Sequence, residues 1–320
     1  MEKDNPSVPN VLKSLARLLG TEIKDRRLEI PSQSGKGYCT GFIFNEHIRM
    51  LISNYELNED ILLENPEKDG GKRMIFFKLQ NIFSQSEILS PTKNRTEIPS
   101  VLIATSRLNT DEVIAIHSNI GTINIEVDAD YLTRLFELSG QSPILKSLLE
   151  NTQPYLFEQM MHPSLQKIVN EILYESVDEA FQLFFMRIKA EELICRLMME
   201  LEKRSEKRLY ALNVKDIETI YKVREKLLEH LEIPPVIGKL AADSGMSPTK
   251  LKRLFRQIFG DSIFSYYQTF RIKEAAFLLK ENKYSVSEVG YKLGFTNLSH
   301  FSKIFKEHNG MNPKQYAMNS

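Results

Sequence analysis

Hydrophobic positions in the first 130 residues follow two different spacings. Residues 8–20 carry apolar side chains at helical intervals and end at Gly20, which predicts a short helix. Beyond residue 26, short runs of β-branched and aromatic residues predict strands at 41–44, 48–55, 73–79, 101–104, 113–117 and 122–127. Turn chemistry is expected in the breaks at 34–37, 69–71 and 119–121. Several short strands at such intervals indicate an antiparallel sandwich or barrel.

The pattern becomes helical after residue 130 and stays so, with segments at 131–139, 164–174 and 178–203. The longest segment carries an apolar stripe at spacings of three and four residues: Leu183, Met186, Ala190, Leu193, Ile194, Leu197, Met198 and Leu201. Pattern alone leaves two interpretations open. The stripe packs against the sheet, or it forms the contact between two copies of the chain.

Composition places the chain among folded proteins of about two domains, since it has 320 residues, 42% of them hydrophobic and 26% charged. No apolar run approaches the ~20 residues of a membrane span, and the first residues lack the apolar region of a signal peptide. We therefore expect a cytoplasmic protein without a membrane segment. The two cysteines, Cys39 and Cys195, exclude a disulfide framework and are expected to be unpaired thiols.

The net charge of zero conceals an asymmetry along the chain. Residues 231–320 contain 13 basic and 7 acidic side chains, a net charge of +6, so the first 230 residues carry −6. A basic C-terminal segment after an acidic remainder is typical of a protein in which one domain contacts polyphosphate.

A helical unit occurs twice in this basic segment. Residues 236–247 predict a helix and a tight turn, and a second helix begins near Pro248. At a shift of 49 residues, Gly245 and its two successors match Gly294 and its successors. At a shift of 50, the apolar and basic positions of the helix after Pro248 match those of residues 301–310. The capping-box residues Ser285 and Glu288 open the second unit.

Each unit is a predicted helix-turn-helix whose second helix buries one face and presents a basic, polar one. In the first unit the buried residues are Leu251, Leu254, Phe255 and Ile258, and the opposite face is Thr249, Lys250, Lys252, Arg253, Arg256 and Gln257. Such a helix fits the major groove of DNA, where basic side chains bind phosphates and guanine edges. If residues 264–280, a further helix, hold the two units about 34 Å apart, both enter successive major grooves. The alternative is an adaptor that binds an acidic protein.

Residues 215–317 resemble the DNA-binding domain of the AraC/XylS family of transcription regulators. The resemblance lies in Leu240-Ala241, Gly245-Met246-Ser247, Leu251-Lys252-Arg253-Leu254-Phe255-Arg256, Phe259-Gly260, Arg271-Ile272-Lys273-Glu274-Ala275, Gly294-Phe295, Ser299-His300-Phe301-Ser302-Lys303-Ile304-Phe305-Lys306 and Asn312-Pro313-Lys314-Gln315-Tyr316. It covers about a third of the chain. It implies promoter binding by both units of one protomer, with RNA polymerase as a further partner, and a homodimer is expected.

Carried over by position, the resemblance implies six base-contacting residues: Thr249, Lys252, Arg253, Ser299, His300 and Lys303. Four others are expected to contact phosphate: Lys250, Arg256, Asn297 and Lys306. Two positions depart from the family pattern. Gly290 replaces the usual alanine, which should weaken its helix by about 0.5–1 kcal/mol, and Ala317 replaces an arginine.

The N-terminal part resembles siderophore-responsive AraC-type regulators, through Arg187-Ile188-Lys189-Ala190-Glu191-Glu192-Leu193. This implies a cupin-like sensory domain and a small-molecule effector, an iron chelate or another compound. Aromatic residues of the predicted strands are expected to fill a core, so no effector-binding residues are assigned. A regulator without an effector is the alternative. The sequence leaves activation and repression open.

Other chemistry finds little support in the sequence. The chain has no Gly-x-Ser-x-Gly elbow, phosphate-binding loop or dinucleotide motif, so we expect neither an enzyme nor a cofactor. The histidines do not form short-spaced pairs, and no metal site is assigned, although a barrel could bring His47 and His117 together. The predicted fold is α+β with two domains: a β-rich cupin-like sandwich or barrel with flanking helices, and an all-α double helix-turn-helix. Its boundaries are 1–130, 131–212 (helical dimerisation and linker region) and 213–320.

Overall fold

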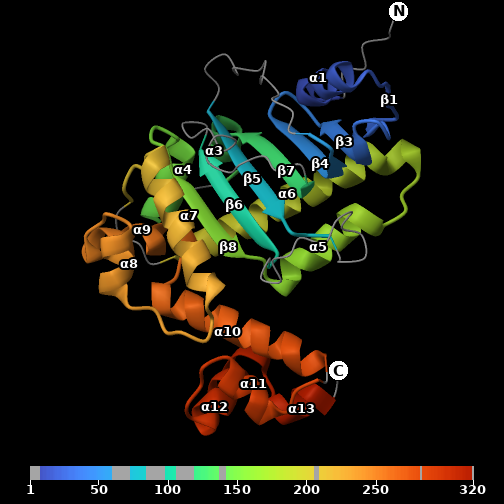
Figure 1. The fold of residues 1–320 in the computed structure, drawn as a ribbon. Helices are drawn as coiled ribbons and strands as arrows, with labels where there is room; N and C mark the ends of the chain where they lie inside the picture. Colours follow the sequence, from blue (N-terminus) through green and yellow to red (C-terminus); the bar gives the residue numbers. More distant parts are fainter. Residues whose placement is uncertain are drawn as a thin grey trace, which may run out of the picture. The chain divides into compact units, whose positions relative to one another are not determined.

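The computed structural model describes residues 8–59, 73–83, 98–105, 119–136, 142–204, 209–281 and 283–318. The chain divides into two compact units, residues 1–214 and 215–320, which are described separately. Figure 1 shows a sheet with helices in the first unit and helices alone among the described residues of the second. The α+β fold class is thereby confirmed.

The first unit is built on one eight-stranded sheet in which all neighbouring strands are antiparallel, in the order β1-β2-β3-β4-β7-β5-β6-β8. The strands are β1 (Ile23–Lys24), β2 (Arg27–Glu29), β3 (Gly35–Ile43), β4 (Ile48–Leu57), β5 (Met74–Gln80), β6 (Ser100–Thr105), β7 (Asn119–Asp128) and β8 (Leu156–Met160). Because β8 pairs with β6, residues beyond position 130 complete the sheet.

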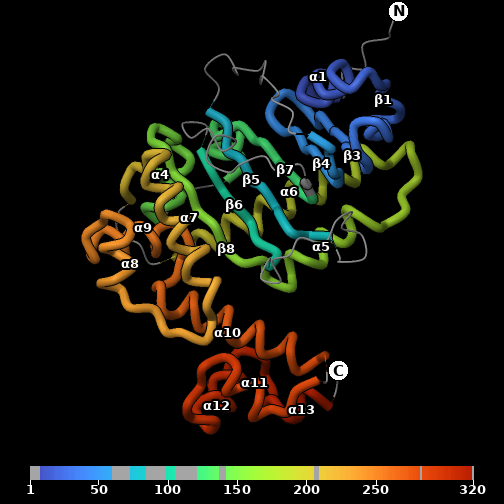
Figure 2. The backbone as a smooth tube through the Cα atoms, in the orientation of Figure 1, coloured from blue at the N-terminus to red at the C-terminus, as the bar shows by residue number. Residues whose placement is uncertain are grey.

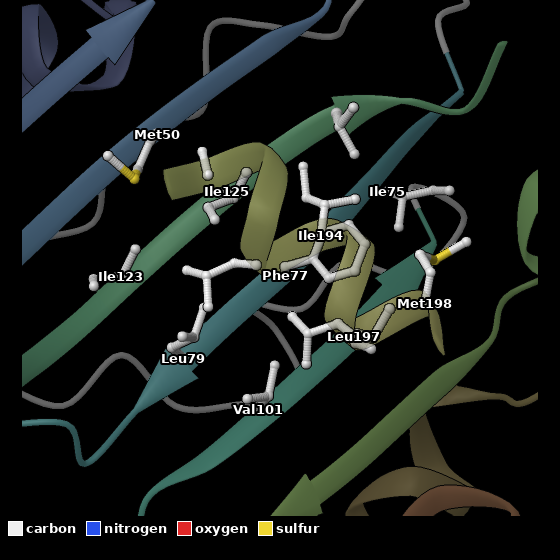
Figure 3. Close-up of a cluster of buried hydrophobic side chains, with 14 of the residues drawn as sticks. Met50, Ile75, Phe77, Leu79, Val101, Ile123, Ile125, Ile194, Leu197 and Met198 are labelled. Atoms are coloured by element: carbon white, nitrogen blue, oxygen red, sulfur yellow. The ribbon is translucent and has the colours of Figure 1, made fainter. Parts of the chain in front are cut away.

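The strand register aligns apolar side chains in rows on one face of the sheet. One row crosses five strands and consists of Met50, Ile125, Phe77, Ile103 and Phe157. All five side chains are buried. Figure 3 shows part of this face, with residues from the strands meeting the helix that covers it.

The helices of the first unit are α1 (Asn10–Leu19), α3 (Ala129–Leu135), α4 (Pro143–Glu150), α5 (Pro163–Tyr174) and α6 (Glu179–Glu202). Helix α6 crosses one face of the sheet, as Figure 2 shows, and packs Ile194, Leu197 and Met198 onto it. The apolar stripe of α6 is therefore core, which confirms the first of its two interpretations. Helix α1 covers the opposite face of β3 and β4, where Cys39 and Tyr55 are buried.

The structure refines the predicted cupin-like sandwich or barrel. The described strands form a single sheet, and helices supply the layer that faces it. The predicted helix at 8–20 and the predicted strands at 41–44, 48–55, 73–79, 101–104 and 122–127 are confirmed, with bounds that differ by up to six residues. The predicted strand at 113–117 and the turn at 69–71 lie outside the described residues.

The predicted turn at 119–121 is wrong, because these residues lie within β7. The predicted turn at 34–37 is displaced: the amides of Ser34 and Gly35 donate to the carbonyl of Pro31, and residues 35–37 lie in β3. Gly35 and Gly37 pair with Leu57 and Tyr55 of β4, and Gly121 pairs with Asn54. Pairing along strands of nine and ten residues outweighs the local turn preference of glycine and asparagine. Within the described ranges, no helix combines the length and apolarity that a membrane crossing requires.

The described part of the second unit is helical throughout: α7 (Val214–Glu229), α8 (Ile237–Asp243), α9 (Pro248–Phe259), α10 (Ile263–Lys280), α11 (Val286–Lys292), α12 (Leu298–Asn309) and α13 (Pro313–Met318). Helices α8 and α9 form one helix-turn-helix, and α11 and α12 form the other. Helix α10 packs against α9 and against α11, α12 and α13, and Figure 1 shows it between the two pairs.

Candidate nucleic-acid interface

The turns of the two helix-turn-helix units have the same backbone geometry. Gly245 and Gly294 adopt left-handed conformations, with φ of 64° and 74°. In the first unit the amide of Met246 donates to the carbonyl of Ala241 at 3.0 Å. In the second, the amide of Phe295 donates to the carbonyl of Gly290 at 2.9 Å. Both turns thus end their first helix with the same 6→1 hydrogen bond, in the register that the 49-residue shift predicts.

The second helix of each unit, the recognition helix, also begins and ends alike. Ser247 caps α9 by accepting from the amide of Lys250, and Asn297 caps α12 by accepting from the amide of His300 at 3.0 Å. Gly260 ends α9 and Gly310 ends α12, both in the left-handed conformation. The predicted capping box at the start of α11 is confirmed.

The repeat extends further than the sequence pattern indicated. Tyr266 of α10 and Tyr316 of α13 are 50 residues apart, and both pack edge-on against the recognition helix of their unit. The ring of Tyr266 lies 5.4 Å from Phe255, and that of Tyr316 lies 5.3 Å from Phe305. Each recognition helix is therefore held by an aromatic side chain from the helix that follows it.

The structure leaves all six predicted base-contacting side chains exposed to solvent. They are Thr249, Lys252 and Arg253 on α9, and Ser299, His300 and Lys303 on α12. The apolar positions between them, including Leu251 and Phe301, are buried. One expectation was wrong: Gln257 is only 2% exposed and belongs to the packed side of α9. Gln257 lies on the same side of α9 as the buried residues Leu254 and Ile258, although the preceding residue, Arg256, is exposed.

The four predicted phosphate-contacting residues fall into two groups. Arg256 and Lys306 occupy equivalent exposed positions in the last turns of α9 and α12. Lys250 is half-buried, and its ammonium group lies 2.8 Å from a carboxylate oxygen of Asp216 on α7. An ammonium group has three donors, so this ion pair leaves capacity for a phosphate oxygen. Asn297 uses its side-chain carbonyl oxygen as the cap of α12, and its side-chain amide nitrogen is a hydrogen-bond donor.

The two recognition helices carry unequal charge. Helix α9 has four lysine or arginine residues and no acidic one. Helix α12 has two lysines, two histidines and Glu307. Helix α9 therefore carries more of the positive charge that attracts polyphosphate.

Sequence reasoning assigned no role to Arg271, which the structure places at the second turn. This residue of α10 is 5% exposed, and its guanidinium donates two hydrogen bonds, of 3.0 and 2.6 Å, to the carbonyl of Leu293. The same group lies 3.8 Å from the ring centre of Phe295. Burial lowers the pKa of Arg271 from its ordinary value. An arginine on the buried side of a predicted helix is the signal that could have pointed to this role.

Gly290 has a packing role in addition to its effect on helix propensity. It is buried, and a Cβ at this position would lie 2.6 Å from Cδ2 of Leu298 at the start of α12. Glycine therefore allows α11 and α12 to approach closely. Gly290 is therefore expected to weaken α11 through its low helix propensity, and at the same time it permits the close contact between α11 and α12.

The remaining candidate residues, two histidines and two cysteines, belong to residues 1–214. His47 is partly buried, with Nδ1 3.5 Å from a carboxylate oxygen of Asp128 and its ring stacked on Tyr131. His117 lies outside the described residues, and those that are described contain no group of three side chains suited to a metal ion. Burial raises the pKa of the Cys39 thiol to about 12, whereas Cys195 is exposed.

The C-terminal part of the chain, which contains the two helix-turn-helix units, is similar to known proteins. Residues 240–319 match a family model described as a helix-turn-helix domain. The chain is 34% identical over 80 residues to the arabinose operon regulatory protein of Escherichia coli, which is 25% of this chain and 27% of that protein. It is 38% identical over 71 residues to regulatory protein PchR of Pseudomonas aeruginosa, which is 22% of this chain and 24% of that one. The chain thus spans about a quarter of the length of these curated relatives.

Among solved structures, the DNA-binding domain of AdpA, a global transcriptional factor in complex with a target DNA, is 30% identical. It covers 32% of this chain and 91% of its own, with a TM-score of 0.30.

The fold and the repeated turn geometry define a double helix-turn-helix domain of the DNA-binding type. In this domain, about a quarter of its length, the chain is similar to the arabinose operon regulatory protein.

Proposed function

We propose that the protein regulates transcription by binding promoter DNA sequence-specifically, with its two recognition helices in successive major grooves. The observation that carries this proposal is the repetition of one helix-turn-helix geometry in a single protomer, with polar and basic side chains exposed at the same positions of each recognition helix. A basic helical surface without a sequence-recognition role would not need this repetition.

The exposed residues have two proposed roles. Thr249, Lys252 and Arg253 of the first unit and their counterparts on α12, Ser299, His300 and Lys303, contact base edges and supply specificity. Lys250, Arg256, Asn297 and Lys306 bind phosphates and supply affinity that falls with salt.

Replacement of each recognition surface tests these roles. Alanine at positions 249, 252 and 253 together should abolish the preference for one half of the bound site, and alanine at 299, 300 and 303 should abolish the preference for the other half. Binding is measured against duplexes in which each half is scrambled. Equal loss on every duplex would place these residues on phosphates only. Binding to an acidic protein without a preferred DNA sequence would favour the adaptor.

We further propose that the protein forms a homodimer through the outer face of α6. Opposite its buried stripe, this helix exposes Phe181 (64%), Phe184 (66%), Ile188 (44%) and Met199 (58%). Phe181, Phe184 and Ile188 follow the spacing of three and four residues that is typical of a helix pair, and Met199 lies about three turns further along the same face. Two ion pairs flank this face, Arg187 with Glu191 at 2.9 Å and Arg196 with Glu192 at 2.8 Å, and a second copy would meet these charged groups at the edge of the contact.

The dimer is tested by sedimentation of the full chain. Phe184→Glu should shift the association equilibrium towards the monomer by about tenfold or more, because it places a charge in the apolar contact. Leu18→Glu is the matched control, since Leu18 on α1 is an equally exposed apolar residue, 59% accessible, on another helix. Equal association of both variants and the unmodified protein would exclude α6 as the contact.

Control by a small-molecule effector is the remaining part of the proposal. The division of the chain into an α+β unit and a DNA-binding unit supports a sensory role for the first. Iron chelates are the first compounds to test, by their effect on DNA affinity of the full chain. An affinity that no compound changes would favour a regulator without an effector. Promoter binding would place the protein in the cytoplasm with RNA polymerase as a partner, which transcription from the bound promoter in vitro tests.

A further inference from the structure

The loop between α7 and α8, residues 230–236, reaches from the first helix-turn-helix to the turn of the second. Gly294, at the second turn, lies so close to the backbone of Glu232 that a Cβ at this position would overlap the Glu232 carbonyl oxygen. The equivalent glycine of the first turn, Gly245, has no described atom within 4 Å of its Cβ position. The turn itself requires only a left-handed residue, so the close approach at Gly294 is a separate feature.

A buried tyrosine fixes the same loop to α10. The hydroxyl of Tyr267 donates to the carbonyl of Leu231 at 2.8 Å, and this tyrosine is fully buried. The guanidinium of Arg271 lies 5.1 Å from the Tyr267 ring centre and binds the carbonyl of Leu293 in the second turn. Loop, linker helix and second turn are thus joined by a short chain of buried contacts.

The helix before the loop is also attached to the first helix-turn-helix. Two ion pairs join α7 to it: Lys226 with Asp243 at 2.7 Å, and Asp216 with Lys250 at 2.8 Å. Residues 214–236 therefore contact both helix-turn-helix units, and α10 is not the sole connection between them.

We propose that the 230–236 loop, held by Tyr267 and Gly294, fixes the separation of the two recognition helices and thereby sets the spacing between the two DNA half-elements that the protein accepts. The inference rests on the proposed function. Each base pair added between half-elements moves the second by about 3.4 Å and rotates it by about a tenth of a helical turn. A rigid pair of recognition helices cannot follow that change, whereas a loosened pair can.

The test uses the full chain and duplexes that contain its selected site, with the spacer between the half-elements shortened or lengthened by one and two base pairs. The unmodified protein should lose about tenfold or more in affinity for each added or removed pair. Tyr267→Phe, which removes only the hydroxyl, should bind the native spacing more weakly and lose about threefold or less on the altered ones. Gly294→Ala should behave in the same way.

Gly245→Ala is the matched control, because it places alanine at the same left-handed turn position without a loop against it. It should keep the strict spacing of the unmodified protein. A merely structural role of Tyr267 would lower affinity on every spacer equally, so an unchanged spacing preference in Tyr267→Phe overturns the inference.

A measurement without DNA separates this inference from the proposed function. Spin labels on cysteines at exposed positions 249 and 299, in a Cys195→Ser background, report the distance between the recognition helices. Tyr267→Phe should broaden the distribution of distances, and Gly245→Ala should not. Equal distributions in both variants overturn the inference whatever the DNA result, while absence of sequence preference in the unmodified protein overturns the proposed function.

Discussion

Arg271 and Leu293 are joined by two hydrogen bonds from one guanidinium to one carbonyl oxygen, at 3.0 and 2.6 Å. Leu293 ends α11, where the last carbonyl groups of a helix have no partner within the helix. A side chain from α10 therefore completes the end of α11 and holds the turn before the second recognition helix in place.

Replacing Arg271 by methionine should destabilise the second helix-turn-helix by about 2–3 kcal/mol, because the buried Leu293 carbonyl loses a charged donor. Hydrogen exchange of α11 and α12 amides during a urea titration measures this loss. Lys252→Met, at an exposed position of α9, is the control and should stay within about 0.5 kcal/mol of the unmodified protein. An Arg271→Met variant as stable as this control would contradict the role given to Arg271.

Alanine at the two turn glycines should have unequal cost. Gly245→Ala should destabilise the domain by about 1–2 kcal/mol, the cost of a left-handed non-glycine residue. Gly294→Ala should cost more, because its Cβ also overlaps the Glu232 carbonyl oxygen. Thermal unfolding of the two variants side by side measures the difference, and equal midpoints would show that the loop yields without cost.

Arg253→Ala should lower affinity for the cognate site by about 1–3 kcal/mol and relax the preference at one base position. The reason is that Arg253 is exposed on α9, one turn after its N-terminus, where side chains enter the major groove. Titration against the cognate duplex and its single-base variants measures the effect. An equal loss on random DNA would make Arg253 a phosphate contact instead.

Lys306→Ala should weaken binding to cognate and random DNA alike and reduce the salt slope by about one, the contribution of one phosphate contact. Affinity measured at several salt concentrations gives the slope. Glu307→Gln on the same helix is a control with the opposite expectation, because removal of a negative charge beside the DNA should not weaken binding. An unchanged slope in Lys306→Ala would count against the phosphate role.

The two cysteines should differ in reactivity towards a thiol reagent. Cys195 is exposed and should react at once in dilute native protein, whereas Cys39 is buried and its pKa is raised to about 12, so its thiolate is scarce at neutral pH. Counting modified thiols should give one in the native state and two after unfolding. Rapid modification of both in the native protein would contradict the packing of α1 over Cys39.

The sequence predicted those features that repeat or alternate. The helix-turn-helix units were predictable because Gly245 and Gly294 recur at a fixed shift with a basic recognition helix after each. The short strands β1, β2 and β8 were not, because their positions depend on a partner strand far along the chain.

The exposure of the proposed base-contacting positions followed from helical spacing, but the contacts behind these positions did not. Tyr267, Arg271 and Glu232 act through a carbonyl or a backbone approach, which leaves no periodic pattern. Lys250 was expected to contact phosphate because of its positive charge and its position. Its ion pair with Asp216 could not be predicted, because that pair depends on where α7 packs. Interactions between segments distant in sequence are therefore the part that required the structure.

Selection from a random duplex library with the full-length protein, at near-physiological salt, is the direct test of sequence-specific DNA binding. We expect an enriched motif with two half-elements about one helical turn apart, one for each recognition helix. If the full chain enriches no motif, whereas a fragment of residues 215–320 does, then residues 1–214 mask DNA binding until an effector arrives. Failure of both the chain and this fragment to enrich any motif would contradict sequence-specific DNA binding.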